Sequence, residues 1–128
     1  MLRRAVVQKL KTLTALKGAY QAFLAPADAS KPYATVKLSD LIGDPGIKYA
    51  GAQQVEVRIY DVLDSFIALD TIEGAIVAAL NGRNITDSVT GHEFHMEYSP
   101  GGGDFVDEEK ELIGRLVRFE AALVREPQ

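Results

Sequence analysis

The fold is decided by the stretch Gln54-Val55-Glu56-Val57-Arg58-Ile59-Tyr60, in which apolar and polar side chains alternate. In an extended chain the three β-branched residues fall on one face, and Glu56, Arg58 and Tyr60 fall on the other. This period of two residues is typical of a strand that buries one of its faces. The sequence therefore predicts a β-sheet with residues 54–60 as a central strand.

An amphipathic helix is predicted at the start of the chain, from Leu2 to Lys17. Its apolar residues recur at steps of three and four: Leu2, Val6, Leu10, Leu13 and Leu16. Gly18 follows where a helix commonly ends in a left-handed residue. This spacing predicts a helix that covers the sheet with one apolar face.

A second helix is predicted directly after the central strand. Ser65 is a suitable N-cap residue, and Asn81-Gly82 is a suitable stop. Between them lies an apolar stripe of Leu69, Ile72, Ile76, Ala79 and Leu80. The sheet is therefore expected to carry two helices.

Shorter strands are expected on both sides of these elements. The alternating segments 33–38 and 92–98 predict strands, and 20–24 is compatible with a short one. Three segments rich in Gly, Pro, Asn and Asp predict connections, namely 41–52, 84–91 and 100–104.

The end of the chain fits two periods. Leu112, Leu116, Phe119 and Leu123 would form one face of a helix, whereas Val117, Phe119, Ala121 and Leu123 would form one face of a strand. The residue types favour a helix slightly, since Glu, Leu, Ala and Arg all have high helix propensity. Gly114 favours a strand, because a glycine inside a helix costs about 1 kcal/mol relative to alanine.

Composition limits the class of protein. With 128 residues, of which 47% are hydrophobic and 25% charged, the chain is expected to be one globular domain, 1–128. The sequence has no cysteine, which excludes thiol nucleophiles, thiolate zinc sites and disulfides. A net charge of −4 would repel a phosphate backbone, so we expect no direct nucleic-acid binding. No apolar run approaches the roughly 18 residues of a membrane span, so no membrane partner is expected.

The only candidate metal ligands form the cluster His92, Glu93, His95 and Glu97. On a strand, His92 and His95 point to opposite faces and cannot bind one ion together, whereas Glu93, His95 and Glu97 share a face. We therefore expect no bound metal, and predict that this face is solvated or lies at an interface.

No catalytic motif is present. None of Ser65, Ser88 and Ser99 stands in a Gly-x-Ser-x-Gly turn. The glycine run 101–103 is followed by Asp104, which would repel a phosphate, instead of by Lys and Ser or Thr. The sequence predicts neither a cofactor nor enzymatic activity.

Four segments together resemble a known family. They are Lys31-Pro32-Tyr33-Ala34-Thr35-Val36, the segment 51–60 (GAQQVEVRIY), the helix from Ser65 to Leu80, and Gly114-Arg115-Leu116-Val117-Arg118-Phe119-Glu120-Ala121. In this order they are similar to the tail-completion proteins of long-tailed phages, the family that includes the tail terminators. The resemblance covers nearly the whole chain.

The resemblance implies an α+β fold, with a small mixed, mainly antiparallel β-sheet packed against two α-helices, and it favours a strand over 116–124. It also implies a virion structural protein that completes or caps the tail tube at the head–tail junction. The expected assembly is a ring of six copies, and the expected partners are the chain itself, the tail tube protein and head–tail connector proteins. The expected location is the virion tail, and the host cytoplasm during assembly.

The contacts with neighbours are expected in two loops, 39–52 and 99–111, which are rich in Gly, Pro and Asp. We expect both loops to be mobile in the free protein and ordered in the virion. The acidic run 107–111 in the second loop is expected to face arginines of a neighbouring copy. The interface candidates are Asp44, Lys48, Tyr49, Asp104, Asp107, Glu108, Glu109, Arg115 and Arg118.

Two alternatives stay open. One is another component of the head–tail neck. The other is a small-molecule-binding domain or enzyme on an α+β scaffold, in which a pocket would be lined by Tyr20, Tyr33, Tyr60 and His95.

Overall fold

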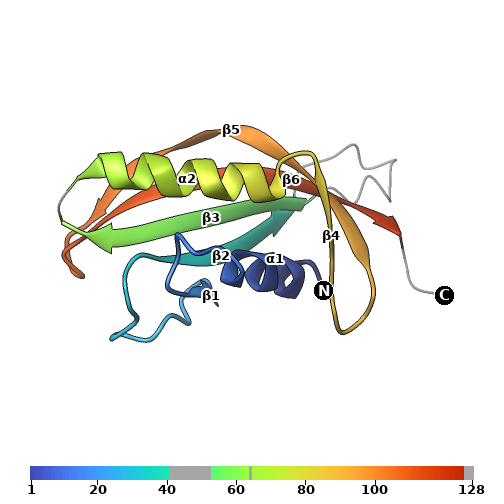
Figure 1. Ribbon diagram of the computed structural model, residues 1–128, viewed down its shortest axis with the longest axis horizontal. Coiled ribbons are helices and arrows are strands. Elements are labelled where there is room, and N and C mark those ends of the chain that lie inside the picture. Colours follow the sequence, from blue (N-terminus) through green and yellow to red (C-terminus); the bar gives the residue numbers. More distant parts are fainter. Residues whose placement is uncertain (41–52, 64, 126–128) are drawn as a thin grey trace.

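The computed structural model describes residues 1–40, 53–63 and 65–125 (Figure 1). The predicted connection 41–52 lies outside these residues, together with the interface candidates Asp44, Lys48 and Tyr49. The elements are α1 (Leu2–Lys11), β1 (Ala19–Gln21), β2 (Tyr33–Asp40), β3 (Gln53–Val62), α2 (Phe66–Leu80), β4 (Arg83–Thr86), β5 (Glu93–Asp107) and β6 (Leu112–Arg125).

The strands form one six-stranded sheet in the order β1-β2-β3-β6-β5-β4. β1 and β2 are parallel, and the other neighbouring strands are antiparallel. Both helices lie on the same face of the sheet (Figure 1). The expected α+β fold, with a mixed and mainly antiparallel sheet, is thereby confirmed.

The core lies between the helices and the sheet. β3 contributes its β-branched residues, and β6 contributes Val117 and Phe119, all nearly or fully buried. α2 contributes Leu69, Ile76 and Leu80, each 0% exposed. Full burial of a side chain of this size contributes about 1.5–3 kcal/mol. The alternation in β3 and the stripe of α2 therefore meet in one apolar layer.

α2 agrees with the prediction at both ends. Ser65 is the N-cap, and its Oγ accepts a hydrogen bond of 3.1 Å from the backbone N–H of Ile67. The helix ends at Leu80 with Asn81 as the C-cap.

α1 is shorter than predicted, because it ends at Lys11 and not at Lys17. Thr12 is the C-cap, and its hydroxyl donates a 2.6 Å hydrogen bond to the carbonyl of Lys9. Successive turns then join Leu13 to Leu10 and Leu16 to Leu13 through backbone hydrogen bonds. These turns keep Leu16 in the core at 8% exposure, although the helix has ended.

The predicted short strand 20–24 is displaced to Ala19–Gln21. The chain turns away at Phe23, which has a positive φ of 68°, and Phe23 is 90% exposed. The segment 84–91 was predicted as a connection, but its first three residues belong to strand β4 (Arg83–Thr86), which pairs with β5. The turn is formed by residues 87–91.

The predicted glycine loop at 100–104 is wrong, since β5 continues through it to Asp107. The pairing with β6 shifts register between Ser99 and Gly103, which is a β-bulge. A Cβ on Gly102 would lie 1.9 Å from the carbonyl oxygen of Leu116. Glycine is needed here for close backbone approach inside a strand, so it does not mark a loop.

The predicted strand at the end of the chain is confirmed, and the helical alternative is wrong. β6 runs from Leu112 to Arg125 between β3 and β5. Gly114 lies within it, and a Cβ there would lie 2.2 Å from the ring of Phe105. The glycine makes room for that ring on the second face of the sheet.

Candidate functional site

The face of the sheet opposite the helices is not covered by any described helix (Figure 1). One end of this uncovered face carries a row of aromatic rings. Tyr33 stacks on Tyr60 with ring centroids 5.1 Å apart. Tyr20 meets Tyr33 edge-on at 5.9 Å, and Phe105 meets Tyr60 edge-on at 5.5 Å. The row crosses the sheet from β1 to β5.

Two tyrosines in this row have a raised pKa. Burial raises the pKa of the Tyr33 phenol above its ordinary value, and it also raises the pKa of the Tyr60 phenol. The ammonium of Lys110 lies 5.7 Å from the centre of the Tyr60 ring, at a distance typical of a cation–π contact.

A groove of about 300 Å³ opens beside this row, between the chain after β1 and the turn after β5. Its polar lining consists of Thr35, Lys37, Arg58, Tyr60, Asp107 and Lys110. A second hollow of about 270 Å³ adjoins it at Ala25 and Lys110. The two hollows form a shallow polar surface, and none of the described residues that line them is a nucleophile paired with a base.

Three charged side chains lie close together on the uncovered face, and two of them form an ion pair. Glu56 and Arg118 are register partners on β3 and β6. Arg58 Nη1 lies 3.2 Å from Glu56 Oε2, so the two side chains form an ion pair. The geometry is not that of a hydrogen bond, and Glu56 Oε2 has no hydrogen-bond partner among the described residues. Arg118 Nη1 lies 3.5 Å from the carbonyl oxygen of Gly101 and so folds along the bulge of β5.

The histidine cluster lies at the opposite end of the uncovered face. His95 contacts Asn84 Oδ1 through Nδ1 and Glu97 Oε1 through Nε2, both at 2.6 Å. Asn84 Nδ2 donates a 2.7 Å hydrogen bond to Glu93 Oε2. The prediction that Glu93, His95 and Glu97 share a face is thus confirmed. Within the described part of the chain, no group of three or more His, Asp or Glu side chains is placed to hold a metal ion.

The ligand-pocket alternative is only partly consistent with this geometry. Tyr20, Tyr33 and Tyr60 do lie together, but His95 does not join them. His95 pairs with Ala122 on β6, eight residues from Gly114, the β6 partner of Tyr60. Eight residues of strand span roughly 27 Å.

Arg115 is engaged by three carboxylates of its own chain. It lies on the helix-covered face, where its Nη1 donates to Glu73 at 2.6 Å and its Nη2 to Asp70 at 2.8 Å, both on α2. Its Nε donates to Asp104 of β5 at 2.5 Å. Burial lowers the pKa of the guanidinium, but the three carboxylates outweigh that effect and hold it above its ordinary value. Two interface candidates, Arg115 and Asp104, therefore form a bridge inside the chain.

Of the remaining candidates, Asp107, Glu108 and Glu109 lie near one another, whereas Arg118 lies six residues along β6 from Leu112, the partner of Asp107. Asp107 ends β5 and accepts a hydrogen bond from the backbone N–H of Lys110, and Glu108 and Glu109 are exposed in the turn that follows. The predicted loop 99–111 is thus a strand followed by a short turn at 108–111.

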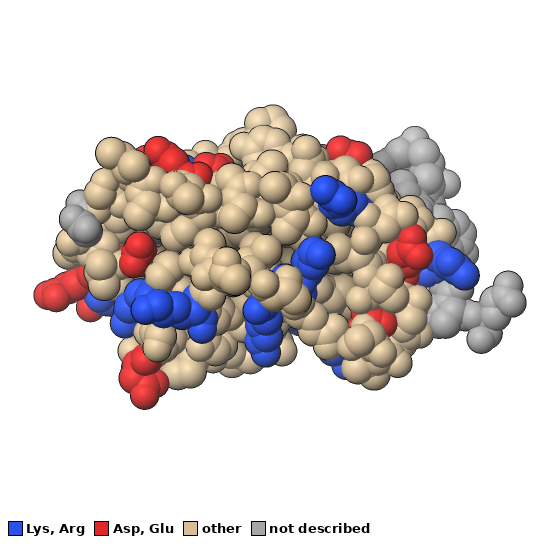
Figure 2. Space-filling view, viewed as in Figure 1, with Lys and Arg blue, Asp and Glu red and all other residues tan. Residues whose placement is uncertain are grey.

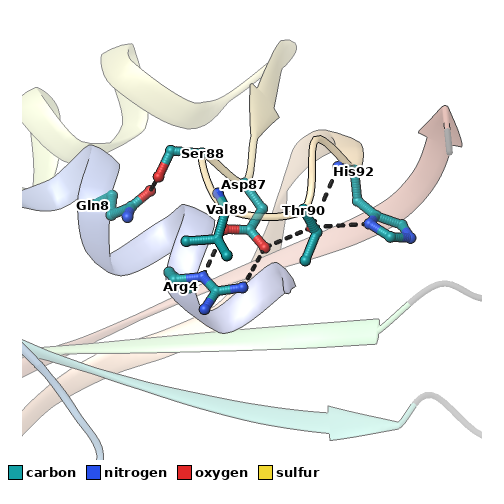
Figure 3. Close-up of polar contacts among 7 residues, drawn as sticks. All are labelled: Arg4, Gln8, Asp87, Ser88, Val89, Thr90 and His92. Atoms are coloured by element: carbon teal, nitrogen blue, oxygen red, sulfur yellow. Dashed lines mark hydrogen bonds and ion pairs between the residues drawn. The ribbon is translucent and has the colours of Figure 1, made fainter. Parts of the chain in front are cut away.

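One ion pair between a half-exposed arginine and a buried aspartate was missed by the sequence analysis (Figure 3). Arg4 of α1 donates from Nε and Nη2 to the two carboxylate oxygens of Asp87, each at 2.7 Å. Thr90 Oγ1 donates at 2.7 Å and the backbone N–H of Val89 at 3.3 Å, so the carboxylate is fully engaged. The hydrogen bonds from Arg4 hold the pKa of Asp87 well below its usual range.

This pair has a structural role. Asp87 is 0% exposed and joins the turn between β4 and β5 to the first helix. Ser88 strengthens the same junction through a 2.9 Å hydrogen bond to Gln8 (Figure 3). The only sequence signal for it was the turn-rich composition of 84–91, which does not identify a partner 83 residues away.

Charge on the surface is mixed. Figure 2 shows acidic and basic side chains interspersed in the view of Figure 1, without a broad field of one sign. Among the described residues, no helix has the length and apolar character needed to cross a membrane.

Comparisons with known proteins give a fold but no family. No protein-family model matches the chain, and no curated protein matches it. It is similar to a chain in the solved structure of the virion of a native gene transfer agent (GTA) particle, with a TM-score of 0.68 and 18% sequence identity. The similarity covers 95% of this chain and 93% of that chain. The six-stranded sheet with two helices is therefore a fold that this chain shares with a protein of a virion particle.

Proposed function

We propose that this chain is a virion structural protein that completes or caps the tail tube of a phage-like particle, as a ring of six copies at the head–tail junction. The observation that carries the proposal is the likeness in fold, over 95% of the chain, to a chain of the virion of a gene transfer agent particle. The four segments that resemble the tail-completion family support the tail-end role and supply the number six.

The side-chain arrangement is compatible with assembly and gives no support to turnover chemistry. Two of the polar clusters in the described part of the chain, the Arg115 bridge and the Arg4–Asp87 pair, are occupied by ion pairs within the chain. Several large apolar side chains, in contrast, are left in water. They are Phe23, Leu24, Val62, Leu63, Ile67, Val89 and Val106, each more than half exposed. Where such side chains lie together, their apolar surface favours contacts with other proteins.

The test is assembly with and without tail tubes. Light scattering and electron microscopy of the purified chain, at rising concentration, should show rings on the ends of tail tubes purified from the same particle. A chain that stays a 13.9 kDa monomer and leaves the tube ends uncapped would refute the proposal.

A second candidate is a ligand-binding domain, which the groove of about 300 Å³ beside Tyr60 favours. Its expected signature is a small molecule retained through purification and seen by native mass spectrometry. Tyr60→Ala should then abolish retention while the wild-type chain caps no tubes.

A further inference from the structure

Two stretches of strand edge carry no neighbouring strand within the described residues. β4 pairs with β5 only over Glu93–Met96, and the backbone N–H of Tyr98 is then taken by Asn81 Oδ1. The later stretch 103–107 of β5 pairs with β6 on its inner side alone. On the other side of the sheet, β1 pairs with β2 only up to Val36, which leaves the stretch 37–40 of β2.

The backbone groups that point outward from these stretches follow from the pairing. The carbonyl of Val36 accepts from Ala22 on the outer side of β2, so Leu38 also points its N–H and C=O outward. After the bulge, the backbone groups of alternate residues of β5 face β6. Between them, Asp104 and Val106 point their N–H and C=O groups outward, away from β6. Unpaired edge groups of this kind readily accept another strand.

The two edges differ in charge. A hollow of about 290 Å³ runs beside the free edge of β2, and its lining includes Arg3, Lys37 and the exposed ring of Phe23. The free edge of β5 leads instead into the acidic turn of Asp107 and Glu108. The β2 edge is therefore apolar at Leu38 and basic at Lys37 before it ends in Asp40, whereas the β5 edge leads into acidic side chains.

We propose that copies of this chain join head to tail by strand addition, with the stretch 104–107 of β5 in one copy pairing antiparallel to the stretch 37–40 of β2 in the next. In this register Val106 lies opposite Leu38, so their outward backbone groups bond to each other. Asp107 lies opposite Lys37, and Asp104, whose charge is offset by Arg115 of its own copy, lies opposite Asp40. The proposal rests on the proposed function, because it names the contact that builds the ring.

The geometry of the sheet fits such a contact. Three antiparallel steps separate β2 from β5, so they run in opposite directions, and neighbours in the same orientation pair antiparallel. Register partners place Tyr33 and Phe105 in one row across the sheet. Asp107 lies two residues beyond this row in one strand direction, and Lys37 lies four residues beyond it in the opposite direction. Neighbouring copies are thus staggered by six residues, roughly 20 Å, as strands tilted to a ring axis require. A head-to-tail contact of this kind closes into a ring when its rotation closes.

Because the chain has no cysteine, single substitutions give a clean cross-linking test. Lys37→Cys and Asp107→Cys are made in separate chains, mixed under assembly conditions with tail tubes, and oxidised. Directly opposite residues in an antiparallel pair have Cα atoms about 4.5–5.5 Å apart, within reach of a disulfide. The mixture should give at least five times more covalent dimer than either variant alone.

Glu97→Cys is the matched control, because it lies on the same strand and face as Asp107 but about 27 Å from Lys37 in the proposed register. Mixed with Lys37→Cys, it should give no dimer above the single variants. Charge reversal gives a second readout: Lys37→Glu and Asp107→Lys should each weaken ring formation at least tenfold, and the double variant should restore it. Circular dichroism checks that each variant is folded.

The outcomes separate this inference from the proposed function. Rings on tube ends without enriched Lys37→Cys/Asp107→Cys dimer, or without rescue by the double variant, would overturn the strand contact and leave the proposed function intact. A wild-type chain that forms no ring with tail tubes would overturn both.

Discussion

Replacing Arg115 with alanine should destabilise the fold by about 2–5 kcal/mol. The guanidinium is 12% exposed and holds three carboxylates from α2 and β5. The bond to the partly buried Glu73 contributes about 1.5–3 kcal/mol, as charged hydrogen bonds do. Asp70 and Asp104 are 63% and 49% exposed, so each of these pairs contributes about 0.2–1 kcal/mol.

Urea unfolding followed by circular dichroism measures this loss as a change in the free energy of unfolding. The matched control is Arg83→Ala, at an exposed arginine in β4, which should change that free energy by less than about 0.5 kcal/mol. High salt should narrow the difference between wild type and Arg115→Ala, because the half-exposed pairs are screened. A loss below about 1 kcal/mol, or one equal to that of Arg83→Ala, would show that the bridge does not hold α2 to the sheet.

Three further predictions concern other parts of the chain. Asp87→Asn should lower stability at neutral pH. Because the pKa of Asp87 is depressed in the folded protein, the carboxylate contributes fully to stability above about pH 4, and this contribution is lost on acidification. The melting curves of wild type and variant should therefore converge in acid, and a gap that stays constant would contradict this. Gly102→Ala should lower the free energy of unfolding in urea by at least about 1–3 kcal/mol, whereas Gly74→Ala, on the open surface of α2, should raise it by roughly 0.5–1 kcal/mol. Equal effects of the two substitutions would refute the close backbone contact at the bulge. Absorbance titration should show tyrosines that ionise above the ordinary pKa of about 10 and that are lost in Tyr33→Phe and Tyr60→Phe; unchanged titration curves would contradict their burial.

Much of the fold could be predicted because it rests on local patterns. The alternation around Val57 and the stripe of α2 each report burial on one face, and burial dominates the stability of these elements. The C-terminal segment was ambiguous because Phe119 and Leu123 fit both periods. It is a strand because it lies between β3 and β5, a tertiary cause that overrides helix propensity.

The contacts that the sequence analysis missed involve partners that lie far away in the sequence. Gly102 was interpreted as loop because its close contact with the backbone of Leu116 cannot be found in local sequence. The carboxylates of α2 that bind Arg115 were not foreseen either, because they lie 42 and 45 residues away along the chain. Asp87 was overlooked for the same reason, since its partner Arg4 lies in the first helix.

The most direct test of the proposed function is electron microscopy of intact particles in which this chain carries a C-terminal tag labelled with gold. The proposal predicts label only at the head-proximal end of the tail, on a ring of six copies, and it predicts tails without heads when the chain is removed. Label along the tube or absent from the particles, with normal assembly in the absence of the chain, would contradict it.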